Sequence, residues 1–373
     1  MDVMVVAGEA SGDQHAAALL AALKARVPGL RAFGMGGQKL AAQGMELIHG
    51  AHEISVMGVT EVLPRVPRIL KVMGDLAAAA AARKPQLAVL VDIPDFNLRL
   101  ARRLKALGIP IAWYISPMVW AWRRGRVATI AQRVDLMLCI LPFEEAFYQG
   151  TGVNAHFVGS PVLEGMPPHA PVEEFRATLG LAVDQPVLAL LPGSRPGEVR
   201  RILPALAEIG RRQLAKRPGL QLVVPVAPGL DRAELARAFS TPVTFIEGRA
   251  PEVVGASNVA VVASGTATLE AGLMNRPLIV VYRLSAPNWW LGKAMLELKH
   301  ISLVNLLAER GVVPELLQDD FTPEAVCAHI DGLWEGPARE AQLQGLREVR
   351  SKLGAPGASQ RAAELILKLT APA

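Results

Sequence analysis

Short apolar runs rich in β-branched residues alternate along this chain with longer stretches rich in Ala, Leu and Arg. The short runs have the length of buried strands, and the longer stretches have the composition of helices. Strands that alternate with helices pair in parallel, because each helix carries the chain back across the sheet. The expected strands are residues 3–7, 87–91, 111–115, 136–140, 187–191, 222–226, 259–263 and 278–282. The pattern therefore predicts an α/β protein with doubly wound sheets.

The expected strands fall into two groups on either side of a proline-rich stretch, residues 165–171 (GMPPHAP). Proline cannot continue the interior of a strand or helix, so this stretch is predicted to be an interdomain linker. A length of 373 residues also favours two domains over one core. We expect an N-terminal domain at residues 1–165, a second domain at 172–345, and a helical segment at 346–373 that returns to the first domain.

The composition bounds the class of protein. Hydrophobic residues make up 51% of the chain and charged residues 20%, which argues against disorder. Cys139 and Cys327 lie far apart without clustered histidines, so neither a disulfide framework nor a metal site is expected. The first residues have the pattern of a strand and lack that of an export signal, and no apolar run approaches the roughly 18 residues of a spanning helix. The sequence predicts a cytoplasmic protein or one held to a membrane only peripherally.

The net charge of +5 favours anionic partners, which include nucleotide phosphates, phospholipid head groups and nucleic acid. Charge alone does not choose among these partners. The chain has no aromatic RNP pattern, helix-turn-helix signal or zinc finger, so we expect no nucleic-acid partner.

The residues directly after each strand are the candidate site, because parallel sheets bind ligands at the carboxyl ends of their strands. The first such segment is residues 8–13 (GEASGD). Its carboxylates, Glu9 and Asp13, would repel a phosphate, and its spacing is not the dinucleotide fingerprint. We expect sugar hydroxyl groups as the ligand, with Ser11 beside them. The alternative is that Asp13 caps the following helix and Glu9 is solvated. A second glycine segment, residues 34–37, is expected to be a turn or loop.

A buried strand delivers Asp92 to the same edge, and Pro94 breaks the path before a helix that Asp95 or Asn97 can cap. Asp92 then faces the crevice, or it is a second capping carboxylate; the residues leave both interpretations open.

The next strand leads into residues 116–122 (SPMVWAW), which bring Ser116, Trp120 and Trp122 to the same edge. Indoles stack on sugar faces, although they are more often part of a core. Three arginines follow at 123, 124 and 126. They have the chemistry to pair with an acidic acceptor, although a solvated helical face is the more ordinary explanation.

The second half contains a strand, a glycine turn and a helix in which the charges suit a phosphate. Gly193 permits close backbone approach, Ser194 is a neutral donor and Arg195 offers a bidentate fork ahead of a helix N-terminus. A pyrophosphate site is expected here, with a plain turn and a surface arginine as the alternative.

The strand at residues 259–263 is followed by Ser264, Gly265 and Thr266, where Ser264 or Thr266 is expected to cap a helix that carries Glu270. A carboxylate near a helix start can accept hydrogen bonds from the two hydroxyls of a ribose. An ordinary capping-box glutamate is the competing explanation.

Taken together, these segments resemble successive motifs of the lipid-A-disaccharide synthases, in the order of that family. The motifs are residues 8–13, 55–58 (SVMG), 92–97 (DIPDFN), 116–122, 191–195 (LPGSR), 263–270 (ASGTATLE) and 305–308 (NLLA). The resemblance covers nearly the whole chain. It implies a GT-B-type fold of two facing Rossmann-like domains, of which the second holds UDP, and it implies a nucleotide contact for Asn305.

The resemblance also implies the reaction, an inverting transfer of 2,3-diacylglucosamine from UDP to the 6-hydroxyl of 2,3-diacylglucosamine 1-phosphate. The products are the β-1′,6-linked disaccharide and UDP, and no metal or cofactor takes part. It gives Asp92 the role of general base. The leaving UDP needs its charge neutralised more than it needs a proton, which suits Arg195. The attacking alcohol must lose a proton, which requires one base on the opposite face.

Three positions depart from the family pattern: Met118, Ser160 and Val304. Acylated substrates imply work at the inner face of the cytoplasmic membrane. A stripe of apolar residues, flanked by Arg65, Arg68 and Lys71, is the candidate surface for insertion, with a core helix as the alternative. The stripe consists of Val62, Val66, Ile69 and Met73.

Other functions stay open at this stage. They are another UDP-N-acetylglucosamine transferase, a UDP-sugar 2-epimerase of the same fold, and a nucleotide-sugar-binding protein without chemistry. A dehydrogenase is disfavoured because neither glycine segment has the NAD spacing. Oligomeric state is also open, with a homo-oligomer among the options.

Overall fold

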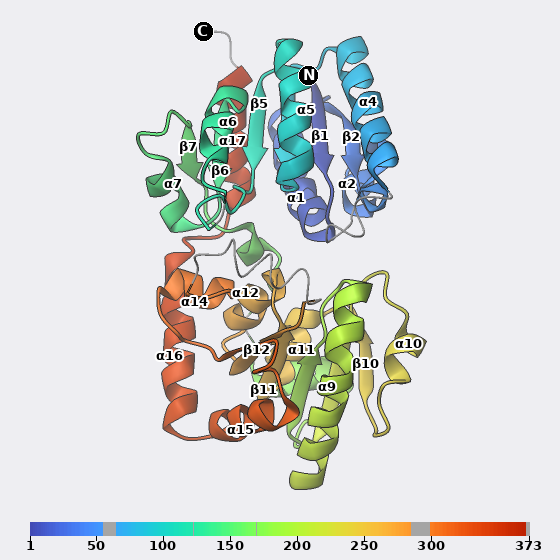
Figure 1. Ribbon diagram of the computed structural model, residues 1–373, viewed down its shortest axis with the longest axis vertical. Helices are drawn as coiled ribbons and strands as arrows, with labels where there is room; N and C mark the ends of the chain where they lie inside the picture. The colour runs from blue at the N-terminus through green and yellow to red at the C-terminus, as the bar shows by residue number, and fades with distance from the viewer. Residues whose placement is uncertain (55–64, 122, 169, 285–298, 371–373) are drawn as a thin grey trace. The chain divides into compact units, whose positions relative to one another are not determined.

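The computed structural model describes residues 1–54, 65–121, 123–168, 170–284 and 299–370. These residues form two compact units (Figure 1). The first unit contains the described residues up to Glu164 and those from Leu353 onward, and the second contains those from Gly165 to Lys352. Each unit has its own parallel sheet, and the two are described in turn.

The sheet of the first unit has seven parallel strands in the order β3-β2-β1-β4-β5-β6-β7. They are β1 (Asp2–Ala7), β2 (Arg31–Gly36), β3 (Met45–Gly50), β4 (Leu87–Val91), β5 (Ile111–Tyr114), β6 (Leu136–Cys139) and β7 (Ala155–Phe157). The order grows outward in opposite directions from the pair β1 and β4. This reversal is the topological switch point of a doubly wound sheet, where a crevice opens at the carboxyl ends of the strands.

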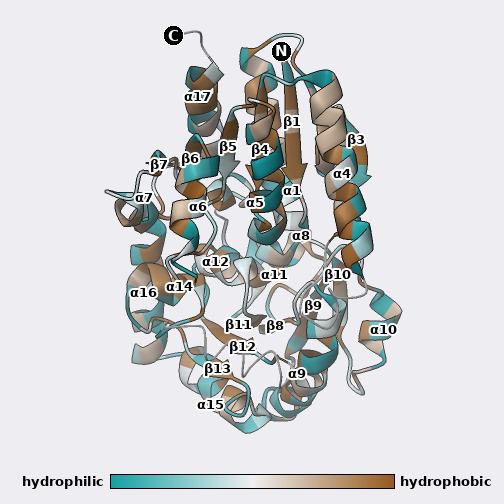
Figure 2. Ribbon diagram, turned by 45° about the horizontal axis from the view of Figure 1, so that its top comes forward, coloured by the Kyte–Doolittle hydropathy of each residue, from teal (hydrophilic) through white to brown (hydrophobic). Residues whose placement is uncertain are grey.

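Helices cover both faces of the first sheet. One face packs against α1 (Ala10–Arg26), α2 (Gln38–Ala42) and α17 (Ala358–Thr370). The other face packs against α4 (Val66–Arg83), α5 (Pro94–Ala106), α6 (Arg126–Arg133) and α7 (Pro142–Tyr148). Because both faces are covered, the inner strands are apolar apart from the charged first residues of β1 and β2. In Figure 2, β1 is mostly brown, whereas α5 and α6 carry teal residues.

The sheet of the second unit has six parallel strands in the order β10-β9-β8-β11-β12-β13, so its switch point lies between β8 and β11. Its strands are β8 (Val187–Leu191), β9 (Gln221–Val226), β10 (Thr244–Glu247), β11 (Val259–Ala263), β12 (Leu278–Tyr282) and β13 (Glu315–Leu317). One face packs against α9 (Pro196–Lys216) and α15 (Pro323–Trp334). The other helices in the described part of this unit are α8 (Val172–Thr178), α10 (Arg232–Ala236), α11 (Ala250–Ala256), α12 (Thr266–Leu273), α14 (Leu303–Ala308) and α16 (Pro337–Lys352).

All eight predicted strands are confirmed, and the α/β class with them. The prediction of a loop at residues 34–37 is wrong, because β2 continues through Gly36. Gly34 has a φ of 145°, and a Cβ on it would overlap the carbonyl oxygen of Val5 on the neighbouring strand. The β2–β3 register shifts between Gly34 and Met35. These glycines therefore allow an irregular strand to approach β1 closely.

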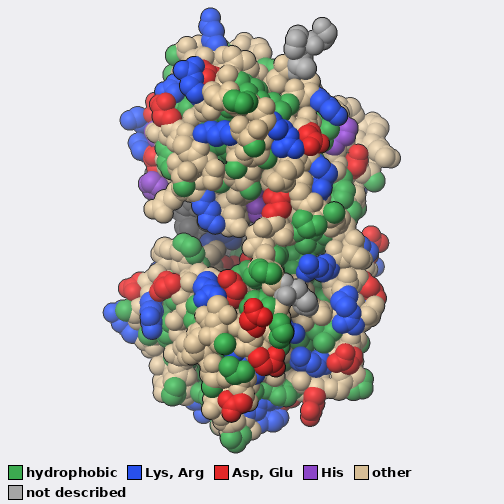
Figure 3. All heavy atoms as spheres, turned by 180° about the vertical axis from the view of Figure 1, so that it is seen from behind, with side chains coloured by type: hydrophobic (Ala, Val, Ile, Leu, Met, Phe, Trp, Pro, Cys, Tyr) green, Lys and Arg blue, Asp and Glu red, His purple; other side chains and the backbone are tan. Residues whose placement is uncertain are grey.

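The surface is mixed in charge. On the face drawn in Figure 3, Lys and Arg are interspersed with Asp and Glu over both units. No helix within the described part of the chain is long and apolar enough to span a bilayer.

The two leucines of α4 allow a test of this packing. Leu76 is fully buried, whereas Leu70 is 48% exposed. We expect Leu76→Ala to lower the free energy of unfolding by about 2–5 kcal/mol, because it leaves a cavity between α4 and the sheet. The matched variant Leu70→Ala should change it by less than about 0.5 kcal/mol. Chemical denaturation followed by circular dichroism measures both, and equal small losses would contradict the assigned face of α4.

Candidate active site

The predicted site segments follow the strands at the two switch points. Residues 8–13 follow β1 and residues 92–97 follow β4, while residues 192–197 follow β8 and residues 264–270 follow β11. In each unit the sheet therefore brings its two candidate segments together.

In the first unit, the segments after β1 and β4 pack directly on each other. A Cβ on Gly8 would come within 2.6 Å of Ile93 Cδ1, so no side chain fits there without movement. A Cβ on Gly12 would stand 4.0 Å from Asp92 Cβ, which is ordinary contact distance. Asp92 therefore lies against Gly12 in the first turn of α1, in the segment that also carries the half-buried Glu9 and Ser11.

The turn that carries Asp92 has a left-handed backbone. Asp92 has a φ of 54° and Ile93 a φ of 40°. This conformation is a genuine outlier for a β-branched residue and costs roughly 1–3 kcal/mol per residue. The Asn97 side chain supports the turn, because its fully buried Nδ2 donates to the carbonyl oxygens of Val91 at 3.2 Å and Asp92 at 2.8 Å.

The predicted caps of α5 are wrong. The helix begins at Pro94, its N-cap is Ile93, and no side chain caps it. Proline has no backbone N–H that a cap would have to satisfy, and its fixed φ suits the first position of a helix. Asp95 instead pairs with Arg123, whose Nη1 lies 3.2 Å from Oδ1, and with Arg126. Trp122 lies outside the described residues.

Asp13 is buried and binds a neighbouring helix. Its Oδ1 accepts the N–H groups of Gly37 at 2.6 Å and Leu40 at 3.3 Å, and its Oδ2 accepts that of Lys39 at 3.0 Å. The alternative that Asp13 caps its own helix is therefore wrong, since α1 begins after Glu9. Asp13 satisfies the free N–H groups at the start of α2 and ties the segment after β1 to it.

Ser116 and Trp120 belong to a polar cluster after β5. Ser116 Oγ lies 3.0 Å from the hydroxyl of Tyr148, and Trp120 Nε1 donates to Glu144 Oε1 at 3.2 Å. The Trp120 ring meets Phe143 edge-to-face with centroids 4.8 Å apart. Trp120 is thus fixed in orientation by one hydrogen bond and one aromatic contact.

Glu144 is a residue that the sequence analysis missed. It is 1% exposed, and this burial raises the pKa of its carboxyl to about 7. The hydrogen bonds that it accepts from the N–H of Leu141, from Trp120 and from the N–H of Ile140 lower the pKa, but burial has the larger effect. The glutamate three residues after Leu141, at the start of α7, was the available signal, because glutamates at this position often bond back to the helix start.

In the second unit, the turn after β8 requires glycine. Gly193 has a φ of 102°, and a Cβ on it would overlap Oε2 of Glu198. Arg195 is the N-cap residue of α9, and Ser194 is exposed beside it. A glycine turn, an exposed hydroxyl, a guanidinium and a helix N-terminus together form a surface suited to an anion.

The segment after β11 differs from its prediction in one respect. Helix α12 begins at Thr266 with Gly265 as its N-cap residue and no side-chain cap, so capping by Ser264 or Thr266 is wrong. Gly265 has a φ of 152°, a conformation that glycine adopts without strain. Glu270 lies in the next turn of α12 and is half-buried.

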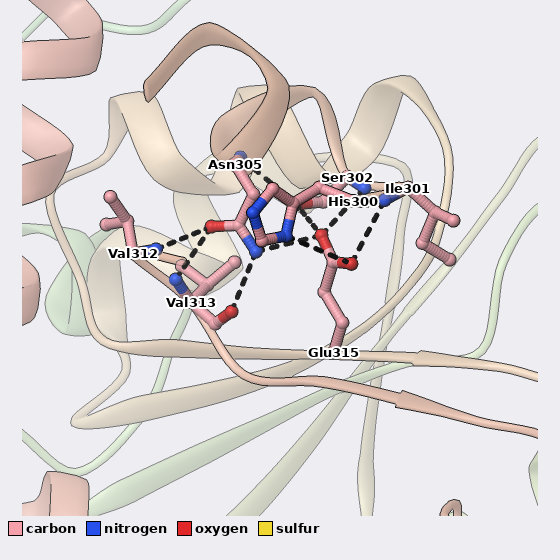
Figure 4. Close-up of polar contacts among 7 residues, drawn as sticks. All are labelled: His300, Ile301, Ser302, Asn305, Val312, Val313 and Glu315. Carbon is pink, nitrogen blue, oxygen red and sulfur yellow. Dashed lines mark hydrogen bonds and ion pairs between the residues drawn. The ribbon is translucent and has the colours of Figure 1, made fainter. Parts of the chain in front are cut away.

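Asn305 is fully engaged inside the second unit (Figure 4). Its Nδ2 donates to the carbonyl oxygen of Val313 at 2.9 Å and to Glu315 Oε1 at 2.8 Å. Its Oδ1 accepts the N–H groups of Val312 at 2.7 Å and Val313 at 2.9 Å. Ser302 caps α14 and donates to Glu315 Oε1 at 2.6 Å. The amide of Asn305 therefore holds the loop before β13 against α14.

Comparison with known proteins decides the family. The profile described as Lipid-A-disaccharide synthetase matches residues 3–367 of this chain. The chain belongs to the lipid-A-disaccharide synthase family. The lipid-A-disaccharide synthase of Myxococcus xanthus (strain DK1622) is 61% identical over 99% of this chain and 98% of its own length. That of Anaeromyxobacter sp. (strain K) is 53% identical over 98% of this chain and 96% of its own length. This synthase is accordingly a glycosyltransferase of lipid A biosynthesis.

Solved structures agree on the fold. MnaA of S. aureus, solved with UDP, has a TM-score of 0.67 at 13% identity and covers 98% of this chain and 94% of its own. The calicheamicin glycosyltransferase CalG4 has a TM-score of 0.60 at 16% identity, covering 99% and 98%. MurG of Acinetobacter baumannii has a TM-score of 0.57 at 16% identity, covering 98% and 99%. These matches confirm the GT-B fold of the synthase. The fold alone does not identify the reaction, which is indicated by the family membership.

Removal of the Asn97 amide tests the support of the Asp92 turn. We expect Asn97→Ala to cost about 1–3 kcal/mol of stability, because two carbonyl oxygens lose their buried donor. Disaccharide synthesis should fall as well, because the Asp92 turn is no longer held. The exposed Arg102→Ala on the same helix is the control for both measurements. If Asn97→Ala matched Arg102→Ala in denaturation and in activity, the proposed support would be refuted.

Proposed function

We propose that this synthase transfers 2,3-diacylglucosamine from UDP to the 6-hydroxyl of 2,3-diacylglucosamine 1-phosphate, with Asp92 as the general base. The observation that carries this proposal is the position of Asp92 at the β1–β4 switch point, against the segment of Glu9 and Ser11 and on a supported left-handed turn. Ligands of doubly wound sheets bind at this point. The half-buried Trp120 and the exposed Asp95 follow the adjacent strand ends and are proposed for the acceptor side, with Asp13 and Ser116 holding the surrounding loops.

The second unit is proposed to bind the UDP donor. Gly193, Ser194, Arg195 and the start of α9 suit the diphosphate, because they combine N–H groups, a hydroxyl and a positive charge. Ser264, Gly265, Thr266 and Glu270 follow the neighbouring strand and suit the ribose hydroxyls. A fold neighbour solved with UDP is consistent with a nucleotide site in this fold. Asn305 acts through the loop it holds, since its amide is engaged internally.

The chemistry follows from these assignments. As the acceptor oxygen bonds to the anomeric carbon, its proton passes to the Asp92 carboxylate. The bond to UDP breaks on the opposite face, and Arg195 with the α9 N-terminus stabilises the charge that develops on the diphosphate. One displacement inverts the anomeric centre and requires neither a covalent intermediate nor a cofactor.

Two variants separate these roles. Asp92→Asn keeps the shape of the side chain but cannot accept the proton, so we expect kcat to fall about 10²-fold or more with UDP affinity unchanged. Arg195→Ala should weaken UDP binding, because it removes the guanidinium fork. Turnover is scored as disaccharide formed from the two acylated substrates, and UDP binding is measured by calorimetry. Near-normal kcat in Asp92→Asn would remove Asp92 from the mechanism.

The acylated substrates also motivate a proposed membrane surface on the first two turns of α4, at the inner face of the cytoplasmic membrane. Val66 is 37% exposed and Leu70 48% exposed, one turn apart. Arg65, Arg68 and Lys71 are exposed around them, which suits an anionic bilayer.

The predicted stripe needs correction. Met73 is buried in the core of the first unit, and Ile69 is only partly buried and packs against that core. Val62 lies outside the described residues. Of the four apolar positions in the stripe, Val66 is therefore the one exposed in the described part of the chain, and Leu70 joins it.

Liposome flotation tests this surface. We expect the double variant Val66→Glu, Leu70→Glu to lose most of its binding to vesicles that contain anionic phospholipid, because it places two carboxylates at the interface. Leu107→Glu is the control, since Leu107 is 46% exposed at the far end of another helix. Equal flotation of the double variant and the control, both folded by circular dichroism, would dismiss the α4 surface.

A further inference from the structure

Glu198 holds an unexplained position at the proposed diphosphate site. It is the third residue of α9 and is 8% exposed, and its Oε2 lies where a Cβ of Gly193 would be. Its other oxygen, Oε1, is buried and has no hydrogen-bond partner among the residues that the structure describes. Buried polar atoms in proteins almost always have a partner, so an orphaned oxygen beside a binding turn calls for one supplied by the ligand.

The groups that face Glu198 come from three places. Burial raises the pKa of its carboxyl. Four neighbouring groups lower that pKa but do not outweigh burial: the Arg195 guanidinium, a hydrogen bond from Tyr282 at the end of β12, the Arg201 guanidinium on α9 and the N–H of Ser194. Burial and the neighbouring Glu198 also raise the pKa of the Tyr282 hydroxyl. Glu198 therefore holds its proton to a higher pH than an exposed glutamate does.

The chemistry of a diphosphate determines which protonation state of Glu198 can bind it through Oε1. The diphosphate of a nucleotide donor offers acceptor oxygens and negative charge, and an ionised carboxylate would repel it. A carboxylic acid is neutral and has one O–H to donate. Only the protonated form of Glu198 is therefore compatible with a phosphate oxygen at this turn.

We propose that Glu198 binds the donor diphosphate as a neutral carboxylic acid, with its Oε1–H donating to a phosphate oxygen. The inference rests on the proposed UDP site of the second unit and adds to it a proton that is bound together with the donor. When the donor arrives, an ionised Glu198 takes one proton from water and keeps it in the complex. UDP affinity is then constant below the pKa of Glu198 in the free enzyme and falls about tenfold per pH unit above it.

Titration calorimetry with UDP tests the proposal in wild type, Glu198→Gln and Glu198→Ala between pH 5.5 and pH 9. Glutamine keeps a neutral donor at the same place, so we expect Glu198→Gln to bind UDP at least as tightly as wild type at high pH, with a smaller pH dependence. Alanine removes the donor, and its affinity should be about tenfold lower at low pH. Two buffers of different ionisation enthalpy report the proton taken up.

The secondary phosphate ionisation of UDP is common to all variants, so the difference between wild type and Glu198→Gln isolates the proton on Glu198. Glu208→Gln makes the same substitution further along α9, and we expect this variant to bind UDP with the affinity and proton uptake of wild type. If Glu198→Gln weakened UDP as much as Glu198→Ala without any difference in proton uptake, Glu198 would be an ionised acceptor and the inference would be overturned. Failure of wild type to bind UDP at any pH would instead refute the proposed donor site.

Discussion

The parallel pairing of β1 with β4 and of β8 with β11 is the constraint on which the rest of the structure depends. At each pair the connections leave in opposite directions, and in doubly wound sheets this opens a crevice at the carboxyl ends of the two strands. The four segments that carry the proposed chemistry all begin at these ends. The glycines at positions 8, 193 and 265 then allow the backbone to turn or approach where a side chain would not fit or would be strained.

The inner strands of both sheets could be predicted from the sequence because they are buried on both faces and read as continuous apolar runs. The missed strands lack that signal. β3, β7, β10 and β13 are at the edges of their sheets, are partly exposed and are short or mixed in polarity. β2 is buried but rich in glycine, which suggested a turn. The hydrophobic pattern thus predicts the centre of a doubly wound sheet better than its margins.

The candidate site was predictable to the level of segments but not of contacts. Strand ends and glycines marked where a ligand binds, and the resemblance to a family supplied the reaction. The support of Asp92 by Asn97 depends on a left-handed backbone turn, and the bonds of Asp13 to the start of α2 join residues 24 to 27 positions apart. The burial of Glu144 and Glu198 could not be predicted, because a glutamate near a helix start has the same local pattern whether it is solvated or buried.

The left-handed pair at Asp92 and Ile93 has a consequence for how this enzyme can be improved. A glycine at position 93 would adopt the observed φ of 40° without strain, but it would uncover the core that Ile93 packs against and would give the unfolded chain more freedom. The same change would give freedom to the backbone next to the proposed base and remove the side chain that packs over Gly8. Relief of backbone strain and retention of packing therefore oppose each other at one residue, so replacing this isoleucine by glycine improves neither stability nor the placement of the proposed base.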